Sequence, residues 1–179
     1  MTTKTKTRWI VDPTHSEIGF KVKHMMFTNV SGKFEKFEAS VESDNDDFED
    51  AIFTFKGETK SINTGNGDRD THLRSGDFFD AEEFPIIGFE STSFKDSDSD
   101  DFIMKGILTI KEIANPITLH AEFMGTAKDP WGNLKAGFSM SGKINRKDWG
   151  LNWNSALEAG GVLVGEEIRL LIDLQFIKE

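Results

Sequence analysis

Four ionisable residues that could do chemistry stand close together in the middle of the sequence: Asp68, Arg69, Asp70 and His72. Arg69 and His72 are able to hold an anionic or oxygen-bearing head group. The same residues also suit a structural role, in which the aspartates stabilise a helix start and pair with the arginine. A His–Asp pair could serve acid–base catalysis, yet the chain has no Cys and no G-x-S-x-G elbow to supply a nucleophile.

A second group lies near the C-terminus, in a long connection between strands at residues 145–165. Long ordered connections in compact domains are often functional. Trp149 and Trp153 share a parity and predict a broad apolar ledge that closes one end of a barrel, with Asp148 and Asn152 as its polar groups. A hydrophobic plug without a ligand role fits the same pattern equally well.

The histidines and cysteines argue against a metal or redox cofactor. The chain has 4 His and 0 Cys, and no two histidines are spaced as H-x-H or H-x-x-x-H. Strand pairing could bring His15 and His24 together, which would give a loose surface site at most. No Gly-rich phosphate loop follows a strand and opens a helix. We therefore expect no metal and no cofactor.

The first group needs a helix to position it, and residues 61–91 carry the one convincing helix signal of the chain. Asp68 is placed to cap this helix, and Gly76 is placed to end it in a left-handed conformation. Phe78 and Phe79 follow and need an apolar surface beneath them. The pattern predicts a small helical insert between strands that closes one mouth of the fold, with Asn66 beside the polar end of a ligand.

Most of the remaining sequence alternates apolar and polar residues with a period of two, which is typical of half-buried strands. Residues 17–24 and 168–176 are clear examples, and a change of parity between Phe34 and Phe37 predicts a bulge. About eight such strands at regular spacing predict an all-β sandwich or closed barrel. Barrels of about eight strands are either filled by their own side chains or hold one small ligand. The Phe-rich inward positions fit both.

Length and charge limit the function classes further. A chain of 179 residues is most simply one domain, here residues 8–179 after an N-terminal tail at 1–7. The net charge of −10 argues against a nucleic-acid partner and disfavours adhesion to anionic membrane surfaces. No apolar run is long enough for a membrane span. The N-terminus lacks the apolar part of a signal peptide, so we expect a cytoplasmic protein, or a periplasmic one if a leader has been removed.

Three stretches together resemble one known family: DPTHSEIGFKVKHMM, INTGNGDRDTHLRSGDFFDAEEFP and NRKDWGLNWNSALEAGGVLVGEEI. Their order and spacing, from about Trp9 to the last strand, are similar to those of the YceI-like family of bacterial polyisoprenoid-binding, lipocalin-like proteins. The segment KEIANPITL departs from the family, which more usually has a Gly and a Lys before the Pro. The resemblance implies an extended antiparallel eight-stranded barrel whose apolar tunnel holds a long isoprenoid or quinone-like lipid. It leaves a homodimer open.

We therefore predict a non-enzymatic protein that binds, and carries or stores, such an amphiphile. Two other classes stay open: an enzyme acting on a bound lipid through His72 with Asp70 or Asp68, and a stress-protective structural domain with a filled core. Arg69 and His72 are expected near the lipid head group, because a head group cannot be buried among Phe rings without polar partners. The predicted ligand-binding residues are Phe20, Val22, Phe34, Phe53, Phe55, Arg69, His72, Phe78, Phe79, Phe89, Phe123, Phe138, Met140, Trp149 and Trp153.

Overall fold

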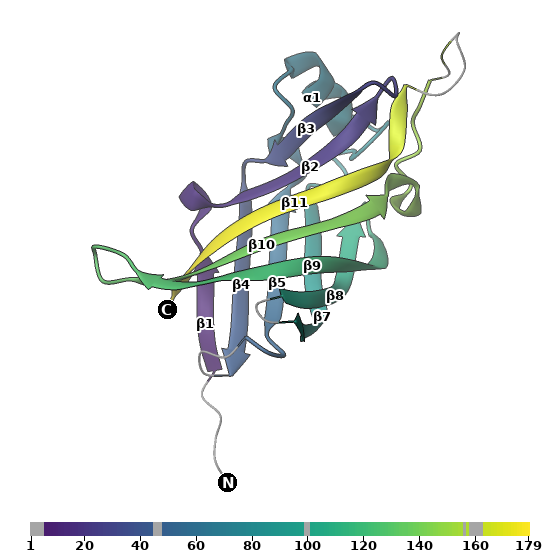
Figure 1. Ribbon diagram of the computed structural model, residues 1–179. Helices are drawn as coiled ribbons and strands as arrows, with labels where there is room; N and C mark the ends of the chain where they lie inside the picture. Colours follow the sequence, from purple (N-terminus) through teal and green to yellow (C-terminus); the bar gives the residue numbers. More distant parts are fainter. Residues whose placement is uncertain (1–5, 45–47, 99–100, 156, 158–162) are drawn as a thin grey trace.

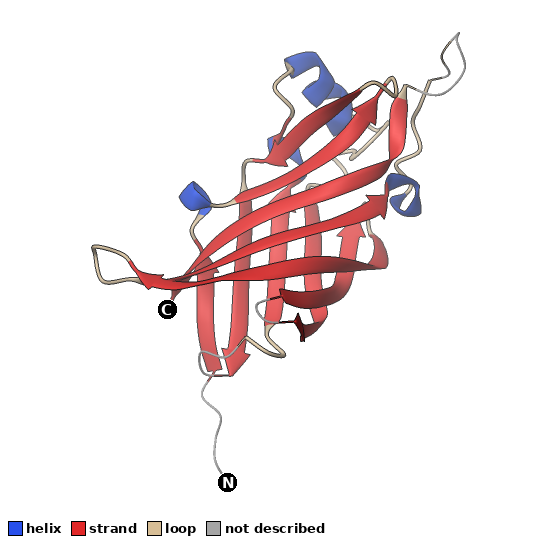
Figure 2. Cartoon of the chain, viewed as in Figure 1, coloured by secondary structure: helices blue, strands red, loops and turns tan. Residues whose placement is uncertain are grey.

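The computed structural model describes residues 6–44, 48–98, 101–155, 157 and 163–179. Strands make up most of this part of the chain, and a few short helices join them (Figure 2). In chain order the elements are β1 (Lys6–Val11), η1 (Pro13–His15), β2 (Glu17–His24), β3 (Thr28–Phe34), β4 (Phe37–Asp44), β5 (Ile52–Glu58), η2 (Thr59–Ser61), β6 (Ile62–Asn63), α1 (Gly67–Arg74), β7 (Ile86–Asp98), β8 (Asp101–Ile110), β9 (Ile113–Lys128), β10 (Leu134–Asn145), η3 (Arg146–Trp149) and β11 (Val164–Lys178).

Within the described residues, eight antiparallel strands close a barrel in the order β1, β4, β5, β7, β8, β9, β10 and β11, and β1 pairs back with β11 (Figure 1). Strands β2, β3 and β6 extend the same sheet from the part of β11 that β1 does not reach. The prediction of an all-β, eight-stranded antiparallel barrel with a short helical insert is confirmed.

Strand β11 shows how the barrel becomes elongated. Its inward residues alternate with polar ones, as a strand with one face on an apolar interior requires. Near its C-terminus it pairs with β1, where Val11 lies opposite Phe176. Nearer its N-terminus it pairs with β2, where Phe20 lies opposite Leu170. Strands β1 and β2 therefore act as one long strand that is interrupted by η1.

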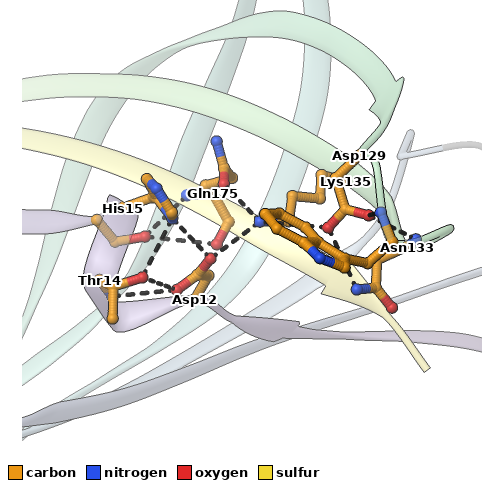
Figure 3. Close-up of polar contacts among 9 residues, drawn as sticks. Asp12, Thr14, His15, Asp129, Asn133, Lys135 and Gln175 are labelled. Atoms are coloured by element: carbon orange, nitrogen blue, oxygen red, sulfur yellow. Dashed lines mark hydrogen bonds and ion pairs between the residues drawn. The ribbon is translucent and has the colours of Figure 1, made fainter.

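The interruption at η1 is held by a buried carboxylate, Asp12 (Figure 3). The backbone N–H and the hydroxyl of Thr14 donate to Asp12 Oδ1 at 3.1 and 2.6 Å. The other carboxylate oxygen, Asp12 Oδ2, lies 2.9 Å from His15 Nδ1 and 3.0 Å from Lys135 Nζ. Lys135 also donates to Gln175 Oε1 at 3.1 Å, so this group ties η1 to β10 and β11.

Replacing Asp12 with asparagine is expected to destabilise the fold in a pH-dependent way. The hydrogen bond from Thr14, and then those from His15 and Lys135, hold the pKa of Asp12 well below its usual range. Because the folded pKa lies below the unfolded value of about 3.9, the ionised carboxylate stabilises the fold above that pH, and this contribution is lost as the pH falls through the folded pKa. We expect a loss of about 1–3 kcal/mol in the free energy of unfolding at neutral pH.

Urea unfolding at neutral pH and at about pH 3 would measure this effect, since the gap between wild type and Asp12→Asn should shrink at the lower pH. Asp173→Asn is the matched control, because Asp173 is exposed on the same sheet. A gap of equal size at both pH values would contradict the assigned role of the Asp12 carboxylate.

One end of the barrel, toward the chain termini in Figure 1, is filled by aromatic rings. Phe48 reaches in from the connection between β4 and β5, and its ring centroid lies 5.4 Å from Trp9, 5.2 Å from Phe123 and 5.1 Å from Phe138. Aromatic pairs at these separations each add about 0.5–1.5 kcal/mol beyond the burial of area. The filled-core interpretation of the sequence therefore holds for this end of the barrel.

Several sequence-based details need correction. The N-cap of α1 is Asn66, whose side chain accepts from the Arg69 N–H, so Asp68 lies inside the first turn. Gly76 lies outside the left-handed region, and α1 ends at Arg74 with an extended Ser75. The predicted bulge between Phe34 and Phe37 is a break between β3 and β4. Strand β1 already begins at Lys6, and residues 1–5 of the predicted tail lie outside the described residues.

Candidate functional site

Beyond the aromatic end, the barrel interior is hollow. The cavity has a volume of about 530 Å³, and its wall is almost entirely apolar. It lies among β2, β3, α1, β11 and the facing strands of the barrel. Its inward-facing side chains on β2 and β11, such as Phe20 and Leu170, are only half-buried because they face empty space. An apolar wall of this kind suits an elongated apolar ligand.

The structure places most of the predicted ligand-binding residues on this wall, and whether they touch a ligand stays a prediction. The residues found there are Phe20, Val22, Phe34, Phe53, Phe55, Arg69, His72, Phe78, Phe79, Phe89, Met140, Trp149 and Trp153.

Phe123 and Phe138 need correction, since neither lines the cavity. Their rings pack against each other at 5.1 Å and against Phe48 in the filled end. Strand parity correctly turned them inward. However, parity does not distinguish the packed end of a barrel from the hollow end, because that depends on which side chains arrive from other strands.

Strand β11 supplies lining residues that the sequence-based set omitted. Ile168, Leu170, Ile172 and Leu174 all face the cavity. Their shared parity in the sequence was a sufficient signal for an inward face. The predicted set favoured Phe residues over aliphatic residues on the same strand face, which is why these four aliphatic residues of β11 are missing from the set.

The helical insert covers the cavity with α1 and the two phenylalanines that follow it. Arg69 donates from Nε to the Thr64 hydroxyl and from Nη2 to the Thr64 carbonyl, both at 2.7 Å. Asp70 is buried and accepts from the Thr64 N–H at 2.9 Å and from its hydroxyl at 2.5 Å. Arg69 is therefore tied to Asp70 through Thr64. Asn66, predicted to lie beside the head group, caps the helix instead.

His72 lies on the cavity wall in contact with two aromatic rings, Phe78 and Trp153, which also contact each other. Its ring centroid is 4.5 Å from that of Trp153 and 5.1 Å from that of Phe78, both edge-on. Its Nε2 lies 2.8 Å from Asp77 Oδ2. The predicted partner of His72 was Asp68 or Asp70, and the structure corrects this to Asp77, because α1 turns Asp70 away toward Thr64.

The most informative residue that the sequence did not single out is Arg146, at the start of η3. It is 3% exposed and lines the cavity. Its guanidinium donates from Nε to the Gly165 carbonyl at 2.8 Å and from Nη1 to the carbonyls of Leu151 at 2.6 Å and Trp153 at 2.9 Å. Burial lowers the pKa of Arg146, while the charge of Glu166 opposes that shift. Arg146 thus links two parts of the chain: the segment that contains the two tryptophans, and the start of β11.

The tryptophan ledge is part of the cavity wall. Trp149 is buried, and its indole Nε1 donates to the Leu108 carbonyl at 2.9 Å. Asp148 and Asn152, its predicted polar groups, are exposed and do not line the cavity. The Gly-rich part of this connection, at 158–162, lies outside the described residues.

The cavity reaches the surface between β2 and α1. Lys23 and Asp68 are its exposed lining residues and mark this mouth. Arg69, His72 and Arg146 are also on the wall, which gives it its main polar groups. An amphiphile inside the cavity would therefore meet a few cationic and hydrogen-bonding groups on an otherwise apolar wall.

The described part of the chain contains no group of three or more His, Cys, Asp or Glu side chains arranged to hold a metal ion. His15 is the last residue of η1 and His24 is the last residue of β2, so the length of β2 separates them, and His15 bonds to Asp12. None of its helices is long and apolar enough to cross a bilayer.

An antiparallel eight-stranded barrel that is packed at one end and encloses an apolar cavity at the other defines a lipocalin-like β-barrel. The chain belongs to the family of the YceI-like domain, whose family model matches residues 9–176. The resemblance predicted from the three sequence stretches is confirmed.

Individual relatives agree with this family. The chain is 40% identical over 171 residues to the UPF0312 protein SAB2563 of Staphylococcus aureus (strain bovine RF122), which covers 95% of this chain and 97% of that protein. It is similar to the crystal structure of the Campylobacter jejuni YCEI protein, with 32% identity, a TM-score of 0.75 and coverage of 100% and 99% of the two chains. The fold also matches a polyisoprenoid binding domain from Saccharophagus degradans, at 12% identity and a TM-score of 0.67 over 99% and 100% of the chains.

Proposed function

We propose that this protein binds one long amphiphile, an isoprenoid or quinone-type lipid, inside the barrel and carries or stores it without chemical change. The observation that carries the proposal is the hollow and almost entirely apolar interior, whose few polar wall residues include Arg69 and His72 of α1. Its volume of about 530 Å³ falls within the range of about 300–1,000 Å³ that is usual for ligand sites. The similar fold from Saccharophagus degradans is that of a polyisoprenoid binding domain, which supports the same ligand class.

The energetics favour a long apolar tail. Each buried methylene contributes about 0.8 kcal/mol, partly offset by the ordering of the chain. The polar groups on the wall are few, so they fix the position of the head group more than they add affinity. We place the head group at the mouth, near Arg69 and His72.

Lipid extraction tests this function directly. Protein purified from the native host is extracted with organic solvent, and the extract is analysed by mass spectrometry. We expect about one amphiphile of prenyl type per chain, and refilling of the emptied protein by the same lipid. An emptied protein that takes up no long-chain amphiphile would contradict the proposal.

One observation favours a second candidate, an enzyme acting on the bound lipid: His72, which lies on the cavity wall, has its Nε2 2.8 Å from Oδ2 of the exposed Asp77. Such a pair can serve as a general base when a reacting group comes within hydrogen-bond reach of the histidine. Turnover of the extracted lipid that is lost in His72→Ala and kept in His120→Ala would establish this candidate. An unchanged lipid over long incubation leaves binding as the function.

Replacing Arg69 with alanine is expected to weaken an anionic amphiphile by about 1–3 kcal/mol of binding free energy, because one charge-assisted hydrogen bond is lost. A neutral lipid with the same tail should lose much less. Arg74→Ala is the matched control, since Arg74 is on the same helix but outside the cavity wall. Titration of both lipids against all three proteins would measure the difference. Equal losses for both lipids would show that Arg69 acts only by holding Thr64.

A further inference from the structure

An exposed apolar tip stands beside the mouth of the cavity. The turn between β2 and β3 consists of Met25, Met26 and Phe27, which are 39%, 64% and 85% exposed. The Met25 N–H donates to the carbonyl of Leu163, and Leu163 lines the cavity. His24 and Lys23, which precede the turn, line it too. Three consecutive large apolar side chains are therefore presented to solvent where the cavity opens.

The backbone of this tip is costly for the residues it carries. Met25 has φ 51° and Met26 has φ 63°, a left-handed conformation that hairpin turns normally give to Asn or Gly. Lys111 and Glu112 of the β8–β9 turn have the same conformation, with φ 53° and 64°, but they are polar. What distinguishes the β2–β3 tip is that its strained positions carry large, exposed apolar side chains, and strain kept under exposed apolar residues suggests a role for those side chains.

A row of cations crosses the outer face of the sheet near the same end. Lys143 of β10 lies directly opposite Arg169 of β11, and Arg169 lies directly opposite Lys21 of β2. All three side chains are exposed, and like charges directly opposite one another destabilise a sheet. The acids on this part of β11 are Glu166, which pairs with Lys147 at 2.8 Å, and Glu167. The row thus carries a local positive charge on a protein whose net charge is −10.

We propose that the β2–β3 tip and this cationic row dock the protein on an anionic lipid bilayer, with the cavity mouth toward the membrane. The apolar side chains of the tip would enter the interface, while the row contacts anionic head groups. The net charge does not prevent this, because exposed charges more than about 8–10 Å away are screened at physiological salt. The docking rests on the proposed function in one respect, namely that the membrane would supply the lipid that enters the cavity.

Vesicle flotation with lipid-free protein tests the docking. Wild type should float with phosphatidylcholine vesicles that contain phosphatidylglycerol, and less with phosphatidylcholine alone. The double variant Met26→Ser, Phe27→Ser should lower binding by roughly tenfold. The triple variant Lys21→Gln, Lys143→Gln, Arg169→Gln should remove the preference for phosphatidylglycerol and the salt dependence.

The chain offers a close control for each variant. Trp131, at the β9–β10 turn, is 82% exposed, nearly as much as Phe27, yet the β9–β10 turn adjoins the opposite end of β11. Trp131→Ser should therefore bind vesicles like wild type. Lys36, Lys56 and Lys128 are exposed lysines outside the row, and their replacement with Gln makes the same change of net charge.

Three results would overturn the proposal: no flotation of wild type with phosphatidylglycerol vesicles, no loss in the tip variant, or an equal loss in the Trp131 variant. A dimer in sedimentation that dissociates in the tip variant, with vesicle binding unchanged, would assign the tip to self-association instead. Uptake of amphiphile from detergent solution, measured without vesicles, reports on the cavity alone. A failure of docking is thereby distinguished from a failure of the proposed function.

Discussion

Replacing Leu170 with tryptophan is expected to weaken the binding of a long amphiphile by about 100-fold while the fold remains as stable as wild type. Leu170 is half-buried on the inner face of β11 and lines the cavity midway along that strand. A larger ring at this position would occupy the path of the tail. If about four methylenes at about 0.8 kcal/mol each are displaced, the loss is about 3 kcal/mol, which corresponds to the expected factor.

The neighbouring residue supplies the control. Leu171 is on the outer face of the same strand and is 41% exposed, so Leu171→Trp makes the same chemical change outside the cavity. A fluorescent prenyl-chain probe titrated against the three proteins gives the dissociation constants, and urea unfolding gives their stabilities. If both variants bind the probe equally well, the ligand does not occupy this cavity.

The opposite outcomes for Phe138 and Met140 show what sequence could and could not predict. The two residues are on the same face of β10, two positions apart, and alternation correctly turns both inward. Met140 lines the cavity, whereas Phe138 packs against Phe48. Phe48 comes from the connection between β4 and β5, outside the strands themselves. Which part of the barrel is filled thus depends on a long-range contact that no local pattern encodes.

The fold itself was more predictable because each strand has one apolar and one polar face. In such strands a slip of one residue would expose the whole apolar face, so the pattern specifies both the strand and its orientation. Strand β2 is an example, with Phe20 and Val22 facing the cavity and Lys21 facing solvent. Helix termini are less certain, and here Asn66 replaced Asp68 as the cap, since both residues suit that position.

Replacing Arg146 with alanine is expected to lower the free energy of unfolding by about 3–5 kcal/mol. This is the largest loss of stability that we expect from replacing a single buried side chain. The sequence does not show which of Arg146 and Lys147 is buried. In the structure Arg146 is 3% exposed, and Lys147 reaches outward to Glu166 at 2.8 Å. Arginine suits the site because its planar fork donates several hydrogen bonds in fixed directions, and lysine cannot reproduce that pattern.

The loss from Arg146→Ala follows from the acceptors left behind. The carbonyl of Leu151 would lose its donor in a buried position, and those of Trp153 and Gly165 would lose theirs in partly buried ones. A fully buried unsatisfied acceptor costs about 1–3 kcal/mol, and the two partly buried ones add to this. Arg169→Ala is the control, because Arg169 is exposed and its loss should change stability by no more than about 0.5 kcal/mol. Urea unfolding of both variants measures the difference. The affinity of Arg146→Ala for the amphiphile should also fall, since Trp153 is then free to leave the cavity wall. If this variant has the stability and the affinity of wild type, the connection is held by its own packing and not by Arg146.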